Sequence, residues 1–280
     1  MVITLTPPQC ITFIDLGTSS PKIGGVVNIT GFVNLTTLIG DGNNITDFIL
    51  SDANDQLEYI ALDRNSLTGS GNQYMPPNVE VINLERNRLD EPLTDLSGFT
   101  QLRVITFSFN RNMGGSIPSL PTSIVGCDLI NSGMSGNIPS LNGLTNLMQF
   151  RVTRNSLTGT IPSVSGCPLL HNFQAHSNQL TGNIPDLSNC TNLERFDVDG
   201  NQLTGYVGGV VSTSIERLNW QNNLLPASAV NTILSDCVAT GTSGSHRSIN
   251  VGGTGNAAPT GQGITDKNTL ISRSWSVTTN

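Results

Sequence analysis

The sequence predicts a repetitive solenoid of the α/β type that is mostly β-strand and loop, with few helices. Two observations predict it. One apolar pattern recurs at nearly constant spacing along the 280 residues, and Asn is unusually abundant, with 31 copies. Repeats of about 20–50 residues indicate units that bury their apolar faces against their neighbours. We therefore expect one continuous right-handed solenoid domain, with a parallel sheet on its concave face.

The repeating unit is most complete at residues 57–67, which fit the pattern LxxLxLxxNxL at every constrained position. Residues 147–157 and 193–203 fit it as well, allowing Phe and Val for Leu. The apolar positions alternate on a short strand and point into the core. The Asn that follows can bridge the backbones of two successive repeats through its buried amide. This Asn column is Asn43, Asn65, Asn87, Asn110, Asn155, Asn178, Asn201 and Asn223, with Ser132 as a weaker bridge.

A second column follows the Asn column and reads GSIP, GNIP, GTIP and GNIP, starting at Gly115, Gly136, Gly159 and Gly182. Pro suits an edge or a turn and not a helix interior, so we expect extended segments on this side of each coil. The combination of LxxLxLxxN with NxLtGxIPxL resembles the plant-type leucine-rich repeats of receptor ectodomains, over about residues 33–225. The resemblance implies a leucine-rich-repeat solenoid that binds a peptide, protein or glycan on its inner face and is not an enzyme in that region. The chain departs from that family in having many 23-residue repeats and no paired-Cys caps.

Both ends of a solenoid must be covered, and the sequence supplies candidates for both covers. Residues 1–32 are expected to form an N-terminal cap, and nine repeats fill residues 33–225. Residues 226–280 are expected to form a C-terminal cap that contains helices. In that cap an apolar helical face runs from Pro226 to Val238, followed by a strand at 248–251, a short helix at 265–273 and a closing strand at 275–278.

Composition excludes several classes of protein. The net charge is -7 and the pI is near 4.8, which argues against a nucleic-acid partner and against docking on anionic membranes. No apolar run is long enough to span a bilayer, and the first residues do not resemble a secretory signal peptide. The odd number of Cys residues, without a CxxC pair, predicts buried free thiols at Cys10, Cys127, Cys167, Cys190 and Cys237.

Sites for metals and cofactors are not expected. His171 and His176 do not have zinc-ligand spacing, and the Gly-rich segment 252–263 lacks a phosphate-binding motif. This segment is expected to be a surface loop in which Asn256 lies outside the Asn column. Asp197 and Asp199 share one strand face and can form a Ca²⁺ site or a glycosidase pair. The alternative is that both are solvated polar residues on an exposed sheet, and no catalytic residue is predicted.

The candidate binding surface is the outward face of the strands in repeats six to nine. Arg gathers there in a chain with only 13 basic residues, and the Arg side chains are interspersed with amides and carboxylates that can fix a polar ligand. Arg151 and Arg195 lie two repeats apart with Gln174 between them, so their long side chains can converge on one ligand group. The candidate residues are Arg151, Arg154, Gln174, His176, Arg195, Asp197, Asp199, Arg217 and Asn219. An ordinary soluble surface with mutual ion pairs is the alternative.

The sequence thus predicts a non-enzymatic recognition or adhesion module for a protein or glycan ligand, at a virion or extracellular surface. A bacterial or bacteriophage version is one form of this hypothesis, in which the chain is a fibre or decoration protein of a phage virion. The alternatives are a structural spacer and a cytoplasmic scaffold for a protein partner.

Overall fold

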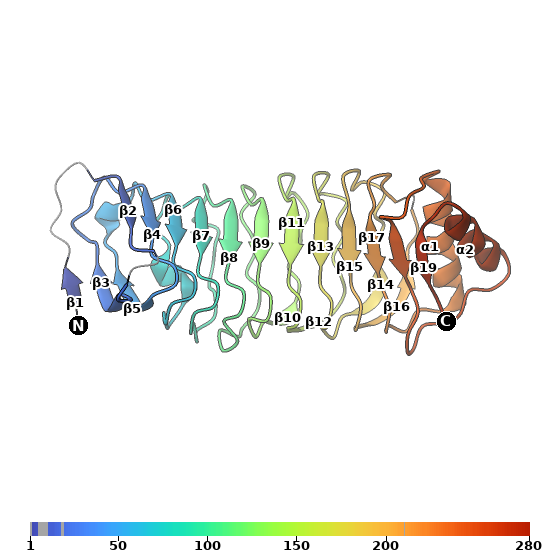
Figure 1. Cartoon of the computed structure of the whole chain (residues 1–280), viewed down its shortest axis with the longest axis horizontal. Helices are drawn as coiled ribbons and strands as arrows, with labels where there is room; N and C mark the ends of the chain where they lie inside the picture. Colours follow the sequence, from blue (N-terminus) through green and yellow to red (C-terminus); the bar gives the residue numbers. More distant parts are fainter. Residues whose placement is uncertain (1, 5–10, 18–19, 210) are drawn as a thin grey trace. The chain divides into compact units, whose positions relative to one another are not determined.

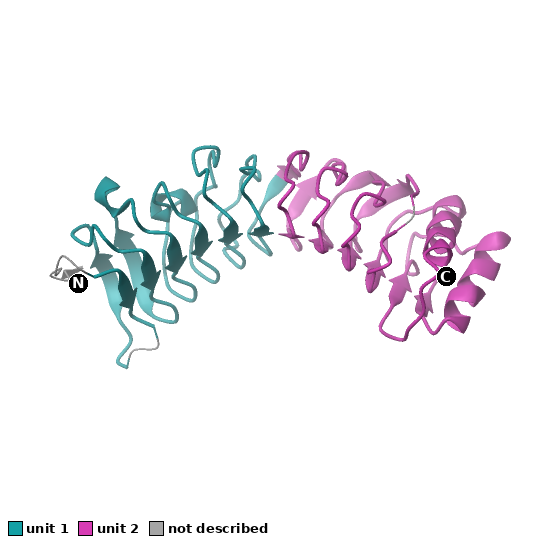
Figure 2. Cartoon of the chain, turned by 90° about the horizontal axis from the view of Figure 1, so that it is seen from above, with its two compact units in different colours: residues 1–135 teal, residues 136–280 magenta. Residues whose placement is uncertain are grey.

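A computed structural model describes residues 2–4, 11–17, 20–209 and 211–280, and it divides the chain into two units. Unit 1 comprises Met1–Ser135 and unit 2 comprises Gly136–Asn280 (Figure 2). Each unit is built of stacked coils, and each coil contributes one short strand to a parallel main sheet (Figure 1). The solenoid expected from the repeats is confirmed.

The main-sheet strands of unit 1 pair in parallel and in chain order. They are β2 (Phe13–Asp15), β4 (Thr37–Ile39), β6 (Tyr59–Ala61), β7 (Val81–Asn83), β8 (Val104–Thr106) and β9 (Gly126–Asp128). A second parallel sheet is formed by β1 (Val2–Thr4), β3 (Gly24–Asn28) and β5 (Asn44–Ile49). Short 3-10 helices occur at Asp52–Asn54 and Gly71–Tyr74. Strand β2 joins the main sheet although it lies within the expected N-terminal cap.

The main-sheet strands of unit 2 repeat this arrangement. They are β11 (Gln149–Arg151), β13 (Asn172–Gln174), β15 (Arg195–Asp197), β17 (Arg217–Asn219), β18 (Ser248–Asn250) and β19 (Ser276–Thr278). Two strand pairs carry the Gly-x-Ile-Pro side of the coils, namely β10 (Ser135–Asn137) with β12 (Ser156–Thr158), and β14 (Thr181–Ile184) with β16 (Gln202–Tyr206). This side is extended, as the Pro column predicts.

The C-terminal end of unit 2 contains the helices α1 (Ala227–Ala239) and α2 (Gln262–Ser272). Helix α1 follows Pro226 and buries Val230, Ile233, Leu234 and Cys237, which is the apolar face expected from their spacing. Helix α2 begins three residues earlier than its pattern suggested, at Gln262. Neither helix, nor any other in the described residues, is long and apolar enough to cross a membrane.

In every main-sheet strand except β19 the central residue is buried in the core of its coil. In unit 2 these residues are aromatic in three successive strands: Phe150 and Phe173 stack with ring centroids 5.6 Å apart, and Phe173 and Phe196 stack at 4.7 Å. All three rings are fully buried. Stacked rings add about 0.5–1.5 kcal/mol per pair beyond the burial of their area, so this column stabilises unit 2 along its length.

The Asn column forms the predicted amide ladder. The Nδ2 of Asn178 donates to the carbonyl of Ala175 in its own coil and to that of Val152 in the preceding coil, both at 3.0 Å. Its Oδ1 accepts from the backbone N–H of Leu157, also at 3.0 Å. Asn43, Asn65, Asn87, Asn110, Asn201 and Asn223 repeat this arrangement. Without the amide, these backbone groups would be buried without partners.

Asn256 belongs to this ladder, and the expectation that it lies outside is wrong. Its Nδ2 donates to the carbonyls of Trp220 and Val251 at 3.0 Å, and its Oδ1 accepts from the N–H of Leu225 at 3.0 Å. Periodicity missed it because helix α1 lengthens the step from Asn223 beyond the usual repeat. The Gly-rich segment is therefore part of a coil that accommodates extra residues before its ladder position.

The four described Cys residues are free and buried, as predicted. The Sγ atoms of Cys167 and Cys190 lie 3.3 and 3.4 Å from the carbonyl oxygens of Leu141 and Val164, in equivalent positions of successive coils. Cys10 lies outside the described residues.

Candidate functional site

The nine candidate residues lie in unit 2, and parallel register decides which of them are neighbours. The row at the third strand position contains Arg151, Gln174, Asp197, Asn219, Asn250 and Thr278. The row at the first strand position contains Gln149, Asn172, Arg195, Arg217, Ser248 and Ser276. Arg151 therefore aligns through Gln174 with Asp197 and not with Arg195, which belongs to the other row.

Arg154 lies away from both rows, in the turn that leaves the strand. The residue before each ladder position has a positive φ, which lies in the left-handed region for Arg154 at 56°. The same turn recurs at Gly42, Arg64, Arg86, Phe109, Asn131, Ser177, Gly200, Asn222 and Gly255. The conformation costs a non-Gly residue about 1–2 kcal/mol, so the stacking of the coils imposes it.

Asp197 is buried, and the prediction that it is a solvated residue of an exposed sheet is wrong. Its side chain is 4% exposed, and its Oδ1 lies 3.1 Å from Nε of Arg217. The contact is an ion pair without the angle of a good hydrogen bond. Burial raises the pKa of the Asp197 carboxyl to about 6, against the opposing effect of Arg217. Asp197 and Asp199 are thus not equivalent, and Asp199 instead accepts a hydrogen bond of 2.8 Å from Nδ2 of Asn219.

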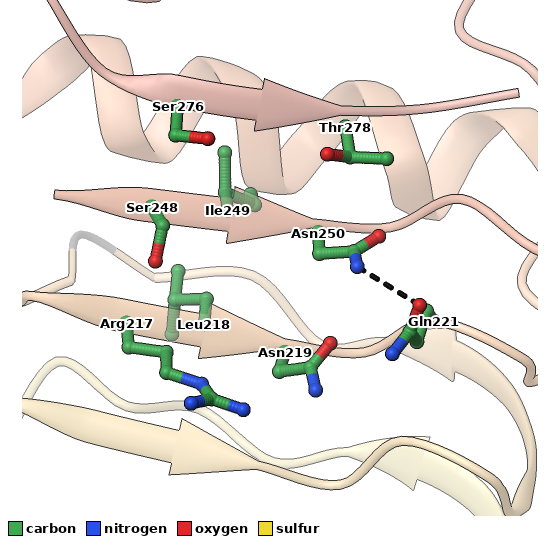
Figure 3. Close-up of a pocket in the computed structure, with 9 residues that line it drawn as sticks. All are labelled: Arg217, Leu218, Asn219, Gln221, Ser248, Ile249, Asn250, Ser276 and Thr278. Carbon is green, nitrogen blue, oxygen red and sulfur yellow. Dashed lines mark hydrogen bonds between the residues drawn. The ribbon is translucent and has the colours of Figure 1, made fainter.

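Asn219 carries an unsatisfied acceptor. The residue is 7% exposed, and its Oδ1 is buried without a hydrogen-bond partner. An unpaired buried polar group costs roughly 1–3 kcal/mol, which a ligand that donates a hydrogen bond would recover. Figure 3 shows this oxygen directed toward β18 while the nitrogen points toward β15.

A cavity of about 280 Å³ lies beside this oxygen, over strands β17, β18 and β19 (Figure 3). Its lining is Arg217, Leu218, Asn219, Gln221, Ser248, Ile249, Asn250, Ser276 and Thr278. Asn250 donates to Oε1 of Gln221 at 2.9 Å, which fixes both amides on one side. Seven of the nine lining residues have polar side chains, so the cavity suits a ligand that both donates and accepts hydrogen bonds.

Only Arg217 and Asn219 of these nine lining residues were predicted as site residues. Among the seven that were missed, Ser248, Asn250, Ser276 and Thr278 have polar side chains on the last two strands. The sequence did predict their strands as parts of the C-terminal cap. Continuing the strand register of the repeats across 248–251 and 275–278 would have identified them, since each stands at a first or third strand position.

The two His residues lie in different surroundings. His176 is half-buried, with Nδ1 3.2 Å from Oγ of Ser177, and burial lowers its pKa, aided by Arg154 and Arg217 and opposed by Asp199. His171 has Nδ1 2.6 Å from the carbonyl oxygen of Leu169. Among the described residues, no three His, Cys, Asp or Glu side chains gather closely enough to hold a metal ion.

Arg195 completes the charge pattern of this surface. Its Nη2 lies 3.6 Å from Oε2 of Glu216, and both side chains are largely exposed. Exposed ion pairs contribute about 0–1 kcal/mol, so Arg195 can exchange Glu216 for an anionic group of a ligand at little cost.

No family model matches the chain, and neither does any curated protein. Solved structures do match. The leucine-rich-repeat ectodomain of the receptor kinase GASSHO1/SCHENGEN3 from Arabidopsis thaliana has a TM-score of 0.63 at 21% identity, covering 80% of this chain and 32% of its own. The ectodomain of the Arabidopsis receptor kinase HAESA has a TM-score of 0.59 at 27% identity, covering 74% and 38%. The chain therefore spans about a third of the length of these ectodomains, and it has their leucine-rich-repeat solenoid fold.

Proposed function

We propose that the chain is a protein-binding module that holds a segment of a peptide or protein on the exposed main-sheet face of unit 2. The observation that carries this proposal is the cavity over β17–β19, with the unsatisfied Oδ1 of Asn219 in its wall. Binding sites place a few polar groups where a ligand must complete their hydrogen bonds, and Asn219 is such a group.

A polypeptide meets the chemical demand of this cavity. Its backbone N–H groups can donate to Asn219, and its carbonyl groups can accept from the hydroxyls of Ser276 and Thr278. An acidic side chain or a terminal carboxylate of the same segment can reach Arg195. The solved relatives support this ligand class, because GASSHO1/SCHENGEN3 was crystallised with CASPARIAN STRIP INTEGRITY FACTOR 2 and HAESA with a peptide hormone.

The proposed setting is outside a cell, where those receptor ectodomains work. A phage virion surface protein is one version of the hypothesis, in which the solenoid recognises a host surface protein. The structural spacer and the cytoplasmic scaffold remain alternatives. A scaffold would bind its protein partner at the cavity, whereas a spacer would leave the cavity without a ligand.

The test is selection from a displayed library of random peptides, with a glycan array probed in parallel. Selected peptides should lose binding to Ser276→Trp, in which an indole fills the cavity. They should keep binding to Ser163→Trp, which adds the same side chain at an exposed position that does not line the cavity. Binding that survives Ser276→Trp would refute the site, and enrichment of glycans alone would refute the ligand class.

A further inference from the structure

The exposed main-sheet face of unit 1 differs in kind from that of unit 2. The first strand positions of β2, β6, β7 and β8 hold Phe13, Tyr59, Val81 and Val104, aligned in one row with Thr37 of β4 between the two aromatic residues. Phe13 is 55% exposed and Tyr59 is 41% exposed. We call this row the apolar strip.

The solenoid does not require the apolar strip. At the same coil position, unit 2 has only polar side chains, namely Gln149, Asn172, Arg195, Arg217, Ser248 and Ser276. The two units share one coil geometry, so folding tolerates polar residues here. A row with two exposed aromatic rings and two partly exposed Val side chains on a sheet face is therefore a feature to be explained by contact with something else.

A line of acidic residues runs parallel to the strip, three positions after each strand centre. It consists of Asp41, Asp63 and Glu85, in successive coils. Burial raises the pKa of the Asp63 carboxyl, and the negative charges of Asp41 and Glu85 add to the rise, whereas Arg64 opposes it. Three carboxylates in successive coils suit a cationic side chain of a ligand.

The turns neutralise this acidic line only in part. Nη1 of Arg64 lies 3.5 Å from Oδ2 of Asp63, and Nε of Arg86 lies 3.0 Å from Oε1 of Glu85. Gly42 stands at the equivalent position of the preceding coil, so Asp41 has no such Arg in its own turn. Asp15 adds another carboxylate near Asp41. The Oδ1 atoms of Asp15 and Asp41 both lie beside Gly17, at 3.0 and 2.9 Å from the position that a Cβ on Gly17 would occupy.

The charge of the whole chain has the same asymmetry. Unit 1 has 13 acidic and 6 basic residues, whereas unit 2 has 7 of each. The entire net charge of -7 therefore belongs to unit 1.

We infer that this face of unit 1 is a second docking surface, separate from the cavity in unit 2, and that it takes an extended segment of a partner protein in which apolar residues alternate with Lys or Arg. Between the strip and the acidic line lies a row that includes Ile39, Ala61 and Asn83. A segment lying over this row would direct alternate side chains to its two sides, the apolar ones onto the strip and the basic ones to the acidic line. From β2 to β8 the row spans roughly 19 Å, enough for about six extended residues.

The test uses the full chain and synthetic peptides in fluorescence anisotropy. An eight-residue peptide of alternating Leu and Lys should bind, whereas alternating Leu and Glu, or Ser and Lys, should bind at least about tenfold more weakly. The pair Asp41→Asn with Asp63→Asn should weaken the Leu/Lys peptide about tenfold, as should Tyr59→Ser. Asp52→Asn with Asp55→Asn removes the same charge from exposed positions off the face and should have no such effect.

Three results would each overturn the inference. In the first, the Asp41/Asp63 pair and the Asp52/Asp55 pair weaken binding of the Leu/Lys peptide equally. In the second, the Ser/Lys peptide binds as tightly as the Leu/Lys peptide, and in the third, Tyr59→Ser leaves binding of the Leu/Lys peptide unchanged. The first two would reduce the surface to a general electrostatic attraction. The cavity variant Ser276→Trp should leave Leu/Lys binding intact, so this surface and the site in unit 2 can fail separately.

Discussion

Nε of Arg217 lies 3.1 Å from Oδ1 of the buried Asp197, so a half-exposed cation covers a buried carboxylate on the face that carries the cavity. The pair joins strands β15 and β17. Arg217 is therefore paired with a buried carboxylate, whereas Arg195 in the same row pairs only with the exposed Glu216.

Asp197 should make stability depend on pH. Burial raises its pKa from 3.8 to about 6, although Arg217 and Arg195 oppose the rise and Asp199 adds to it. The folded protein then holds this proton more tightly than the unfolded chain, so this group lowers the free energy of unfolding as pH rises from about 4 to about 6. In urea titrations, the stability of the wild type relative to Asp197→Asn should decline across that window. A constant difference would show that Asp197 titrates normally.

The amide ladder predicts two matched losses of stability. Asn178→Ala and Asn256→Ala should each lower the free energy of unfolding by roughly 1–3 kcal/mol, because each leaves backbone groups of two coils unpaired. Asn268→Ala, at an exposed position of α2, is the control and should change little. An effect of Asn256→Ala no larger than that of the control would remove Asn256 from the ladder.

The thiols should be unreactive while the protein is folded. Cys127 and Cys237 are fully buried, and burial raises the pKa of Cys190 to about 12, so little thiolate exists at neutral pH. Thiol counting in denaturant without reductant should find about five groups, one for each Cys. Three or fewer would reveal a disulfide, and rapid labelling of Cys190 in the native protein would contradict its burial.

Arg151 and Arg195 should matter for binding and not for folding. Once a ligand of unit 2 is known, Arg151→Ala and Arg195→Ala should each weaken it about tenfold or more if the Arg makes a charge-assisted hydrogen bond. The melting temperature should hardly change for Arg195→Ala, since its pair with Glu216 is exposed. Ser140→Ala and Ser163→Ala, at exposed positions outside the strand rows, serve as controls. Unchanged affinity in both Arg variants would show that the ligand does not extend from the cavity over β17–β19 to either Arg, since neither of them lines it.

The solenoid, its amide ladder and the helices of its C-terminal end all follow from local patterns in the sequence. Each can be recognised from residues close together in the chain. The segment from Leu57 to Leu67 marks one repeat, Asn65 within it is the bridging amide, and Val230 to Cys237 form one helical face. Periodicity also assigned each residue a position within its coil, which predicts whether it points inward or outward.

The contacts between one coil and the next depend on the folded arrangement and not on the local pattern. It buried Asp197 beneath Arg217 and brought Asn256 into the ladder across an irregular step. The physical reason is that burial, ion pairing and hydrogen bonding on a parallel sheet depend on the residue at the same register in the neighbouring strand. That partner lies some 22 residues or more away, and insertions such as helix α1 change the distance without changing the local pattern.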